Sequence, residues 1–173
     1  MSAVKFFYET RDFLDAYRLA ARVEWRQRKR WIFLALVSLL GIGVLTFIAE
    51  PQYRALALAA AAVLMPLGTV AGAWLAQKTS IAINGRIALK TQPVMRDEFT
   101  YEAQPGCLIQ RSRHGESIAR WSELKAFSED NDIWLLYPDF LPRRYYMLPK
   151  RSLTPEFDWA LSDNLQAAGV PRR

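Results

Sequence analysis

The chain has 173 residues, a formal net charge of +6, one cysteine and one histidine. The single cysteine excludes an internal disulfide. With only one histidine in addition, the chain has too few of the usual ligands for a zinc cluster. Residues 1–30 hold eight basic and four acidic side chains. A basic excess next to an apolar segment is typical of a membrane protein, so we expect no nucleic acid partner.

Residues 1–30 are predicted to form a short strand and a basic juxtamembrane helix. Lys5 to Tyr8 is a short aromatic stretch, and Thr10 is a candidate helix cap with Asp12 in the favoured first turn. No proline or glycine occurs from Arg11 to Leu40. We therefore expect this helix to continue into the apolar segment that follows.

Two apolar segments, residues 31–49 and 55–76, contain no charged side chain. Each is long enough to cross a hydrocarbon core of about 30 Å, which takes roughly 20 helical residues. Only residues 50–54 join them, so residues 31–77 are predicted to form a transmembrane helical hairpin. Two alternatives are a cleaved signal peptide, opposed by the polar residues ahead of Trp31, and a helical hairpin buried in a soluble protein.

Basic residues flank both outer ends of this predicted hairpin, including Arg30 before it and Lys78 after it. Because Lys and Arg in short flanks stay on the cytoplasmic side, both termini are expected in the cytoplasm, with a multi-pass membrane anchor between them. The apolar segments lack ionisable groups, which argues against transport. Gly68 and Gly72 form a small-xxx-small pattern for helix packing, either within the hairpin or at a homodimer face.

The chain after the second apolar segment divides into a juxtamembrane helix and linker (78–94), a β-rich domain (95–169) and a frayed tail (170–173). Alternation around Phe99 and Tyr101, turns near Gly106 and Gly115, and an apolar stretch at 133–137 predict an antiparallel sheet. Thr154 is a candidate cap for a last helix with Phe157, Leu161 and Leu165 on its apolar stripe. The predicted fold class is a membrane helical hairpin plus a small α+β domain.

The order of these features resembles the YcxB-like bacterial membrane proteins. The specific marks lie in the tail domain: Phe99 to Ile109 with its Pro-Gly turn, Ile118 to Leu124, Trp134 to Tyr137, and Leu148 to Arg151 before the closing helix. The resemblance implies a bacterial inner-membrane location and a cytoplasmic domain similar to pleckstrin-homology modules, in a family without an agreed biochemical role. It brings no catalytic residues.

The remaining candidate sites are few. Cys107 and His114 fall on neighbouring segments and would be the nucleophile and base of a membrane-tethered hydrolase, although a structural role for both is favoured. A basic set is a candidate for binding lipid headgroups or another anion, against the alternative of a solvated sheet edge: Arg143, Arg144, Lys150 and Arg151. We expect no catalytic residues, metal or cofactor.

The function predicted from these features is a membrane-anchored cytoplasmic binding module. Its partners would be the lipid bilayer and a membrane or cytosolic protein, with a homodimer as a further alternative. An accessory subunit of a larger membrane complex is the main alternative function.

Overall fold

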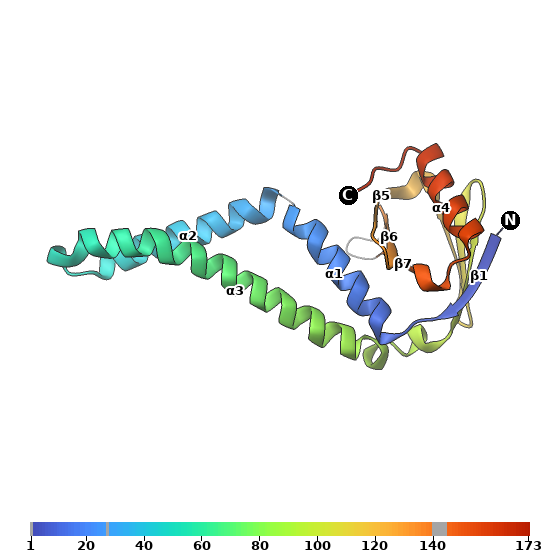
Figure 1. The fold of residues 1–173 in the computed structure, drawn as a ribbon, viewed down its shortest axis with the longest axis horizontal. Coiled ribbons are helices and arrows are strands. Elements are labelled where there is room, and N and C mark those ends of the chain that lie inside the picture. The colour runs from blue at the N-terminus through green and yellow to red at the C-terminus, as the bar shows by residue number, and fades with distance from the viewer. Residues whose placement is uncertain (1, 27, 140–144) are drawn as a thin grey trace. The chain divides into compact units, whose positions relative to one another are not determined.

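The computed structural model describes residues 2–26, 28–139 and 145–173 and divides the chain into two compact units. One unit combines residues 1–20 with 81–173, and the other consists of residues 21–80. We refer to them as the sheet unit and the helical unit. The sheet unit is therefore built from two stretches of chain, one before and one after the helical unit in the sequence, which come together in one body (Figure 1).

The described strands of the sheet unit form two antiparallel sheets, where the sequence predicted one. The first sheet has the order β1-β2-β3-β4 and the second the order β5-β6-β7. The strands are β1 (Ser2–Phe7), β2 (Glu98–Ala103), β3 (Cys107–Ser112), β4 (Gly115–Arg120), β5 (Leu124–Glu129), β6 (Ile133–Pro138) and β7 (Tyr146–Pro149). A short 3₁₀ turn, Trp121–Glu123, connects the two sheets.

Strand β1 completes the first sheet from the far end of the chain. It pairs with β2 along its whole length, with Val4 opposite Tyr101 and Phe6 opposite Phe99. Val4 and Phe6 are buried while Lys5 and Phe7 are exposed, which is the alternation of a strand with one face on a core. The predicted short strand thus exists, and its partner lies more than ninety residues away.

Helix α4 (Pro155–Ala167) closes the sheet unit as predicted. The Thr154 hydroxyl accepts a hydrogen bond from the Phe157 amide at 3.2 Å, and Pro155 occupies the first turn, where a missing amide hydrogen costs nothing. The stripe of Phe157, Leu161 and Leu165 is fully buried. These side chains join a core that includes Trp134, Leu135 and Leu148 from the second sheet.

Residues 170–173, which were predicted to form a frayed tail, are instead bound to the sheet unit. Val170 is buried, and the Phe127 amide of β5 donates a hydrogen bond to the carbonyl of Pro171 at 3.0 Å. Residues 171–173 therefore lie along the outer edge of β5, with a parallel bridge between Phe127 and Arg172.

The helices that reach into the helical unit are α1 (Thr10–Arg26), α2 (Arg28–Ile48) and α3 (Arg54–Thr91), with a 3₁₀ turn at Pro51–Tyr53 between α2 and α3. The predicted continuity of α1 and α2 depends on residue 27, which lies outside the described residues. Helix α3 extends well past the second apolar segment, as expected, and a further 3₁₀ turn begins at Pro93.

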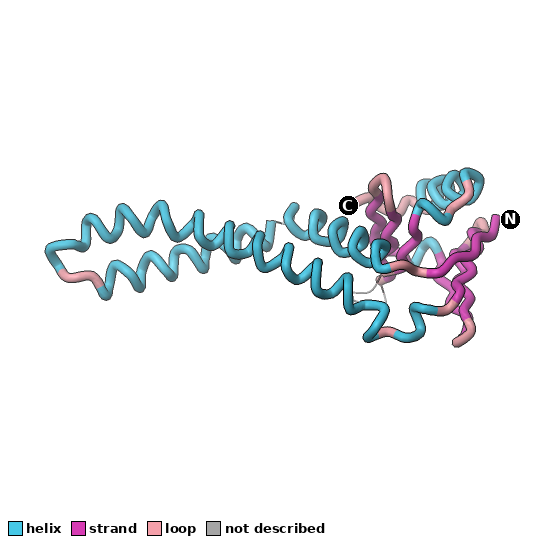
Figure 2. Tube along the Cα trace, turned by 60° about the horizontal axis from the view of Figure 1, so that its bottom comes forward, coloured by secondary structure: helices cyan, strands magenta, loops and turns pink. Residues whose placement is uncertain are grey.

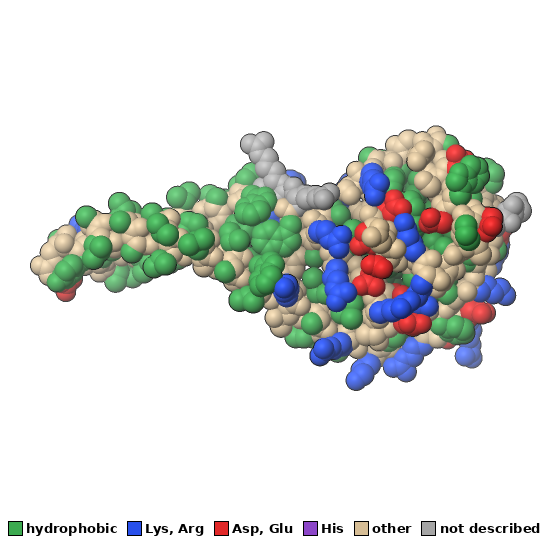
Figure 3. All heavy atoms as spheres, viewed as in Figure 1, with side chains coloured by type: hydrophobic (Ala, Val, Ile, Leu, Met, Phe, Trp, Pro, Cys, Tyr) green, Lys and Arg blue, Asp and Glu red, His purple; other side chains and the backbone are tan. Residues whose placement is uncertain are grey.

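Helices α2 and α3 lie side by side within the helical unit (Figure 2). The hydroxyls of Ser38 and Thr69 are hydrogen-bonded at 2.8 Å, and the Met65 sulfur lies 3.0 Å from the position of a Cβ on Gly41. Both helices are long and apolar enough to cross a membrane, and only 6% of each apolar window is buried. Apolar side chains accordingly cover the face of this unit seen in Figure 3.

Candidate binding site

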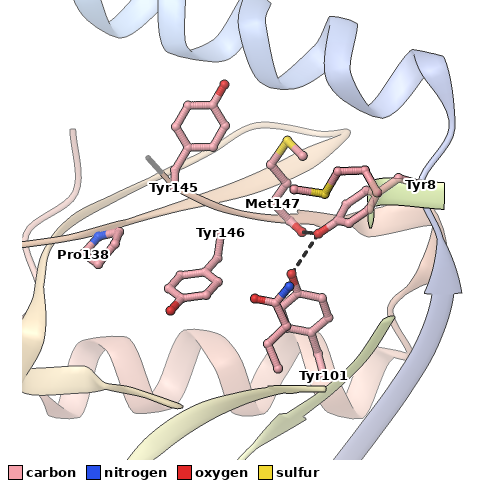
Figure 4. Close-up of a pocket in the computed structure, with 8 residues that line it drawn as sticks. Tyr8, Tyr101, Pro138, Tyr145, Tyr146 and Met147 are labelled. Carbon is pink, nitrogen blue, oxygen red and sulfur yellow. Dashed lines mark hydrogen bonds between the residues drawn. The ribbon is translucent and has the colours of Figure 1, made fainter. Parts of the chain in front are cut away.

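Three residues from separate segments form a buried hydrogen-bond chain in the sheet unit. The Tyr8 hydroxyl donates to the carbonyl of Met147 at 2.7 Å and lies 2.8 Å from the Tyr101 hydroxyl (Figure 4). Because Tyr8 has one proton and gives it to Met147, Tyr101 is the donor in the second bond. The chain joins the residue after β1 to strands β2 and β7.

Burial sets the charge of this pair. Loss of solvent is the largest cause that raises the pKa of Tyr8, followed by the neighbouring Tyr101, and burial likewise raises the pKa of Tyr101. Ionising either phenol would place a charge in a low-dielectric interior. Both tyrosines are therefore neutral hydrogen-bonding groups at physiological pH.

A cavity of about 110 Å³ lies beside these tyrosines. This volume is several times the ~10–15 Å³ that one water needs. Aromatic rings, two thioethers, one proline and one amide line it (Figure 4): Tyr8, Met95, Tyr101, Gln110, Pro138, Tyr145, Tyr146 and Met147. Rings and thioethers with a few polar atoms suit an uncharged ligand with an apolar body.

The walls of this cavity include both connections between the sheet unit and the helices. Tyr8 lies two residues before α1, and Met95 belongs to the 3₁₀ turn Pro93–Arg96 that follows α3. A molecule in the cavity would thus contact the chain just before α1 and just after α3.

Arg151, one of the four predicted anion-binding residues, is held by carboxylates. Its Nη2 and Nε atoms lie 2.7 and 3.0 Å from the two carboxylate oxygens of Asp12, and its Nη1 lies 3.0 Å from Glu9. The bond to Asp12 is the largest cause that raises the pKa of Arg151. Asp12 is buried and also accepts the Glu9 amide at 2.7 Å, so Arg151 fastens the start of α1 to the end of β7.

Lys150 is also paired within the sheet unit. Its Nζ atom lies 2.6 Å from the Glu129 carboxylate and 5.1 Å from the centre of the Trp134 ring. Arg143 and Arg144 lie outside the described residues. The anion site stays a prediction, and an anion at Lys150 or Arg151 would have to compete with a carboxylate already in place.

Gly68 and Gly72 lie on an open face of α3. Apart from the adjacent backbone of α3 itself, no atom among the described residues lies within 4 Å of a Cβ built on either glycine. The contact between α2 and α3 is instead made through Ser38, Thr69 and Gly41. The two glycines therefore make no close contact with α2, and the packing role predicted for them stays a prediction.

The structure does not bring Cys107 and His114 together. Cys107 begins β3, whereas His114 lies in the turn after that strand ends. Five strand steps separate Cys107 from Ser112, or roughly 17 Å at about 3.3 Å per residue. His114 Nε2 contacts Asp97 at 2.7 Å instead, and no cluster suited to a metal ion occurs in the part of the chain that the structure describes.

None of the residues that line the cavity was predicted as a binding residue from the sequence. The alternation predicts that Phe99 and Tyr101 share one face of a strand, and in the structure both are buried. Nothing local in the sequence shows that Tyr8 meets Tyr101, because that contact depends on the pairing of β1 with β2. The aromatic alternation of Phe6 and Tyr8 is the one signal that marks this segment as a buried strand.

Two sheets and a closing helix define the sheet unit as a small α+β domain. Residues 106–164 match the family model described as YcxB-like protein. The chain therefore carries a YcxB-like domain, as the resemblance implied. The match runs from the start of β3 into α4 and includes neither β1 and β2 nor the apolar helices. No curated protein and no solved structure matches the chain.

Proposed function

We propose that the protein is a membrane-anchored interaction module. Helices α2 and α3 form a transmembrane hairpin in the bacterial inner membrane, and the sheet unit binds a partner on the cytoplasmic side. The observation that carries the proposal is the exposure of the two apolar helices. Their windows have mean hydropathies of 2.5 and 1.9 and are 6% buried.

Many large apolar side chains of α2 and α3 are exposed. Leu40 is 71% exposed and Phe47 is 84% exposed. Soluble proteins rarely expose apolar patches beyond a few hundred Å², so a core-helix role for α2 and α3 would require another apolar layer. A lipid bilayer supplies that cover. Trp31 near the start of α2 and Trp74 near the end of the apolar part of α3, both about half exposed, suit the aromatic belt at the cytoplasmic interface of that bilayer.

The charges support the orientation. Arg30 and Lys78 stack on Trp25 and Trp74, at 4.2 and 3.7 Å from the ring centres. The connection at 50–54 carries one acidic and one basic residue, whereas the flanks carry a basic excess. The positive-inside tendency then puts both termini in the cytoplasm.

The strand order supports a pleckstrin-homology-like arrangement of the sheet unit. Four strands followed by three strands, all in sequential order, are closed by a C-terminal helix. In this proposal the transmembrane hairpin is inserted between the first and second strands. The cavity beside Tyr8 and Met95 is then the natural ligand site, because it adjoins the chain segments that lead into α1 and out of α3.

Site-specific cysteine labelling tests the anchor and its orientation. In a Cys107→Ser background, Gln52→Cys probes the loop and Gln166→Cys probes α4, and both positions are exposed. A membrane-impermeant maleimide should label Gln52→Cys in intact spheroplasts and Gln166→Cys only after permeabilisation. Release of the protein by alkaline extraction, or equal labelling of both positions in intact spheroplasts, would contradict the proposal.

A second candidate, a subunit of a larger membrane complex or homodimer, is favoured by the open face at Gly68 and Gly72. Small residues allow close helix contact between subunits. Gly68→Leu with Gly72→Leu should abolish intersubunit crosslinking in membranes and leave the sheet unit folded. Gly43→Leu is the matched control, since Gly43 also has open space around it. Unchanged crosslinking in the double variant would remove this candidate.

A further inference from the structure

The outer edge of β5 already holds a short peptide segment, namely residues 171–173 of the same chain. The Phe127 amide donates to the Pro171 carbonyl at 3.0 Å, and the Arg173 amide donates to the Phe127 carbonyl at 2.8 Å. These two bonds form a parallel bridge with Arg172 opposite Phe127. The segment thus extends the second sheet by one short strand.

The end of α4 delivers this segment to the edge. The Val170 amide donates to the Leu165 carbonyl, and the Gly169 amide donates to the Gln166 carbonyl. Gly169 has a φ of +66°. Together these are the bonds and the left-handed glycine of a Schellman motif. The buried Val170 fixes the direction in which Pro171 leaves.

Two side chains add specificity to the backbone bonds. The Arg172 guanidinium lies 3.3 Å from both the Glu129 carbonyl and the Glu129 carboxylate. The Arg173 guanidinium lies 5.4 Å from the centre of the Tyr137 ring. The edge therefore presents an acid and an aromatic face to consecutive arginines.

The segment is attached lightly. Pro171, Arg172 and Arg173 are all exposed, and the bridge pairs a single position of β5. Side chains and outward backbone groups repeat every second residue along a strand, so Glu129 is the next position at which a longer segment could pair. An incoming strand that continued past the arginines would make more backbone bonds than residues 171–173 do.

We propose that the β5 edge is a strand-addition site for an extended, arginine-bearing segment of another protein, which residues 171–173 occupy until it displaces them. A peptide is the occupant because both groups of Phe127 need backbone partners. Glu129 disfavours an anionic surface at this edge. The inference uses only contacts within the sheet unit and does not depend on the membrane anchor.

The test uses the full chain in detergent micelles and a variant that ends at Val170. The probe is a fluorescent peptide, GVPRRVTV, which repeats residues 169–173 and continues as a strand; GVPEEVTV is its control. Binding by anisotropy should be tighter to the truncated variant than to the full chain. Glu129→Gln in the truncated variant should weaken binding about two- to fivefold, the value of one exposed ion pair. Glu116→Gln, on the other sheet, should leave binding unchanged.

Glu129 also pairs with Lys150, so Glu129→Gln changes more than the contact with the peptide. Amide hydrogen exchange at Phe127 gives a second measurement that does not need this substitution. Exchange should accelerate on truncation and slow again when GVPRRVTV is added. Equal binding of this peptide to both forms, equal binding of GVPEEVTV, or unchanged exchange at Phe127 would overturn the proposal. Crosslinks from Arg172 to β5 of a second copy would also overturn it, since the segment would then be exchanged between copies.

Discussion

Arg151 joins the end of β7 to the start of α1 through contacts that span 139 residues of sequence. Its partner Asp12 is 3% exposed, whereas the Arg151 side chain is 27% exposed. Removal of the guanidinium leaves a buried carboxylate unpaired, which costs ~3–5 kcal/mol for a fully buried pair. Solvent at Arg151 reduces that figure.

We therefore expect Arg151→Ala to lower the free energy of unfolding of the sheet unit by about 2 kcal/mol. Arg151→Lys should recover part of the loss, because an ammonium keeps the charge but not the two-pronged geometry. Denaturant unfolding in detergent measures both, with Arg113→Ala in the β3–β4 turn as the control. A loss in Arg151→Ala no larger than in the control would show that this contact contributes nothing.

Asp15 on α1 differs from Asp12, because its surroundings disfavour the charged carboxylate. Burial is the largest cause that raises the pKa of Asp15, followed by repulsion from Asp132 at the β5–β6 tip, while Arg18 opposes the rise. The folded protein thus binds this proton more tightly than the unfolded chain does. Its stability falls as the pH rises from the ordinary value of 3.8 to the raised pKa, and the penalty is complete above it.

Asp132→Asn should remove part of this penalty. The melting temperature should rise at pH 7, with a gain of no more than about 1 kcal/mol because the groups are partly solvated. Near pH 3 the difference from the natural protein should vanish, because Asp15 is then protonated in both. Asp163→Asn on α4 is the control. A gain that persists at pH 3 would point to a cause other than the ionisation of Asp15.

At the level of elements, α1 and α3 approach each other closely at Leu14 and Gly85 within the sheet unit. A Cβ built on Gly85 would overlap Cδ2 of Leu14 and lie 2.8 Å from its Cγ. Gly85 thus lets two helices meet at a distance that a side chain would prevent.

Gly85→Ala tests whether this contact outweighs helix propensity. In a helix interior alanine is more favourable than glycine by about 1 kcal/mol. An added methyl group in a packed contact, however, destabilises the fold by about 1–3 kcal/mol. We expect a net destabilisation in thermal unfolding, relieved in the double variant with Leu14→Ala. Gly43→Ala, with open space around it, should be neutral or stabilising. A more stable Gly85→Ala variant would show that the two helices can separate without cost.

The elements that the sequence predicted well are those with local signals. Helix α4 has a cap, a proline in the first turn and an apolar stripe, all adjacent in the chain. Strand β5 was missed because its pattern is irregular: Lys125 is an extra residue where the pairing with β6 shifts register. A bulge of this kind breaks the alternation by which strands are recognised.

Contacts that join distant segments could not be predicted in the same way. The pairing of β1 with β2, the bond between Tyr8 and Tyr101, and the clamp of Arg151 on Asp12 each connect residues more than ninety positions apart. The basic residues Lys150 and Arg151 could be picked out from the sequence. The carboxylates that pair with them, on Glu129 and Asp12, could not. One sequence carries periodicity and composition, and neither specifies a long-range partner.

At the scale of the whole molecule, the sheet unit is one domain whose chain is interrupted by the helical unit. Residues 1–20 supply β1, Tyr8 and Asp12, and residues 81–173 supply the other strands and α4. The family match at residues 106–164 covers only part of that domain. A fragment limited to the matched residues should not fold, because it lacks two of the four strands of the first sheet.

The most direct measurement replaces residues 21–80 with a flexible Gly/Ser linker of about 15 residues and follows thermal unfolding of the purified product in buffer without detergent. The account predicts a soluble protein with a single cooperative transition, and loss of that transition when residues 1–9 are also deleted. Aggregation or an unfolded product would show that α2 and α3 belong to the core of the fold. A stable domain without residues 1–9 would show that β1 is dispensable, and the description of one interrupted domain would be wrong.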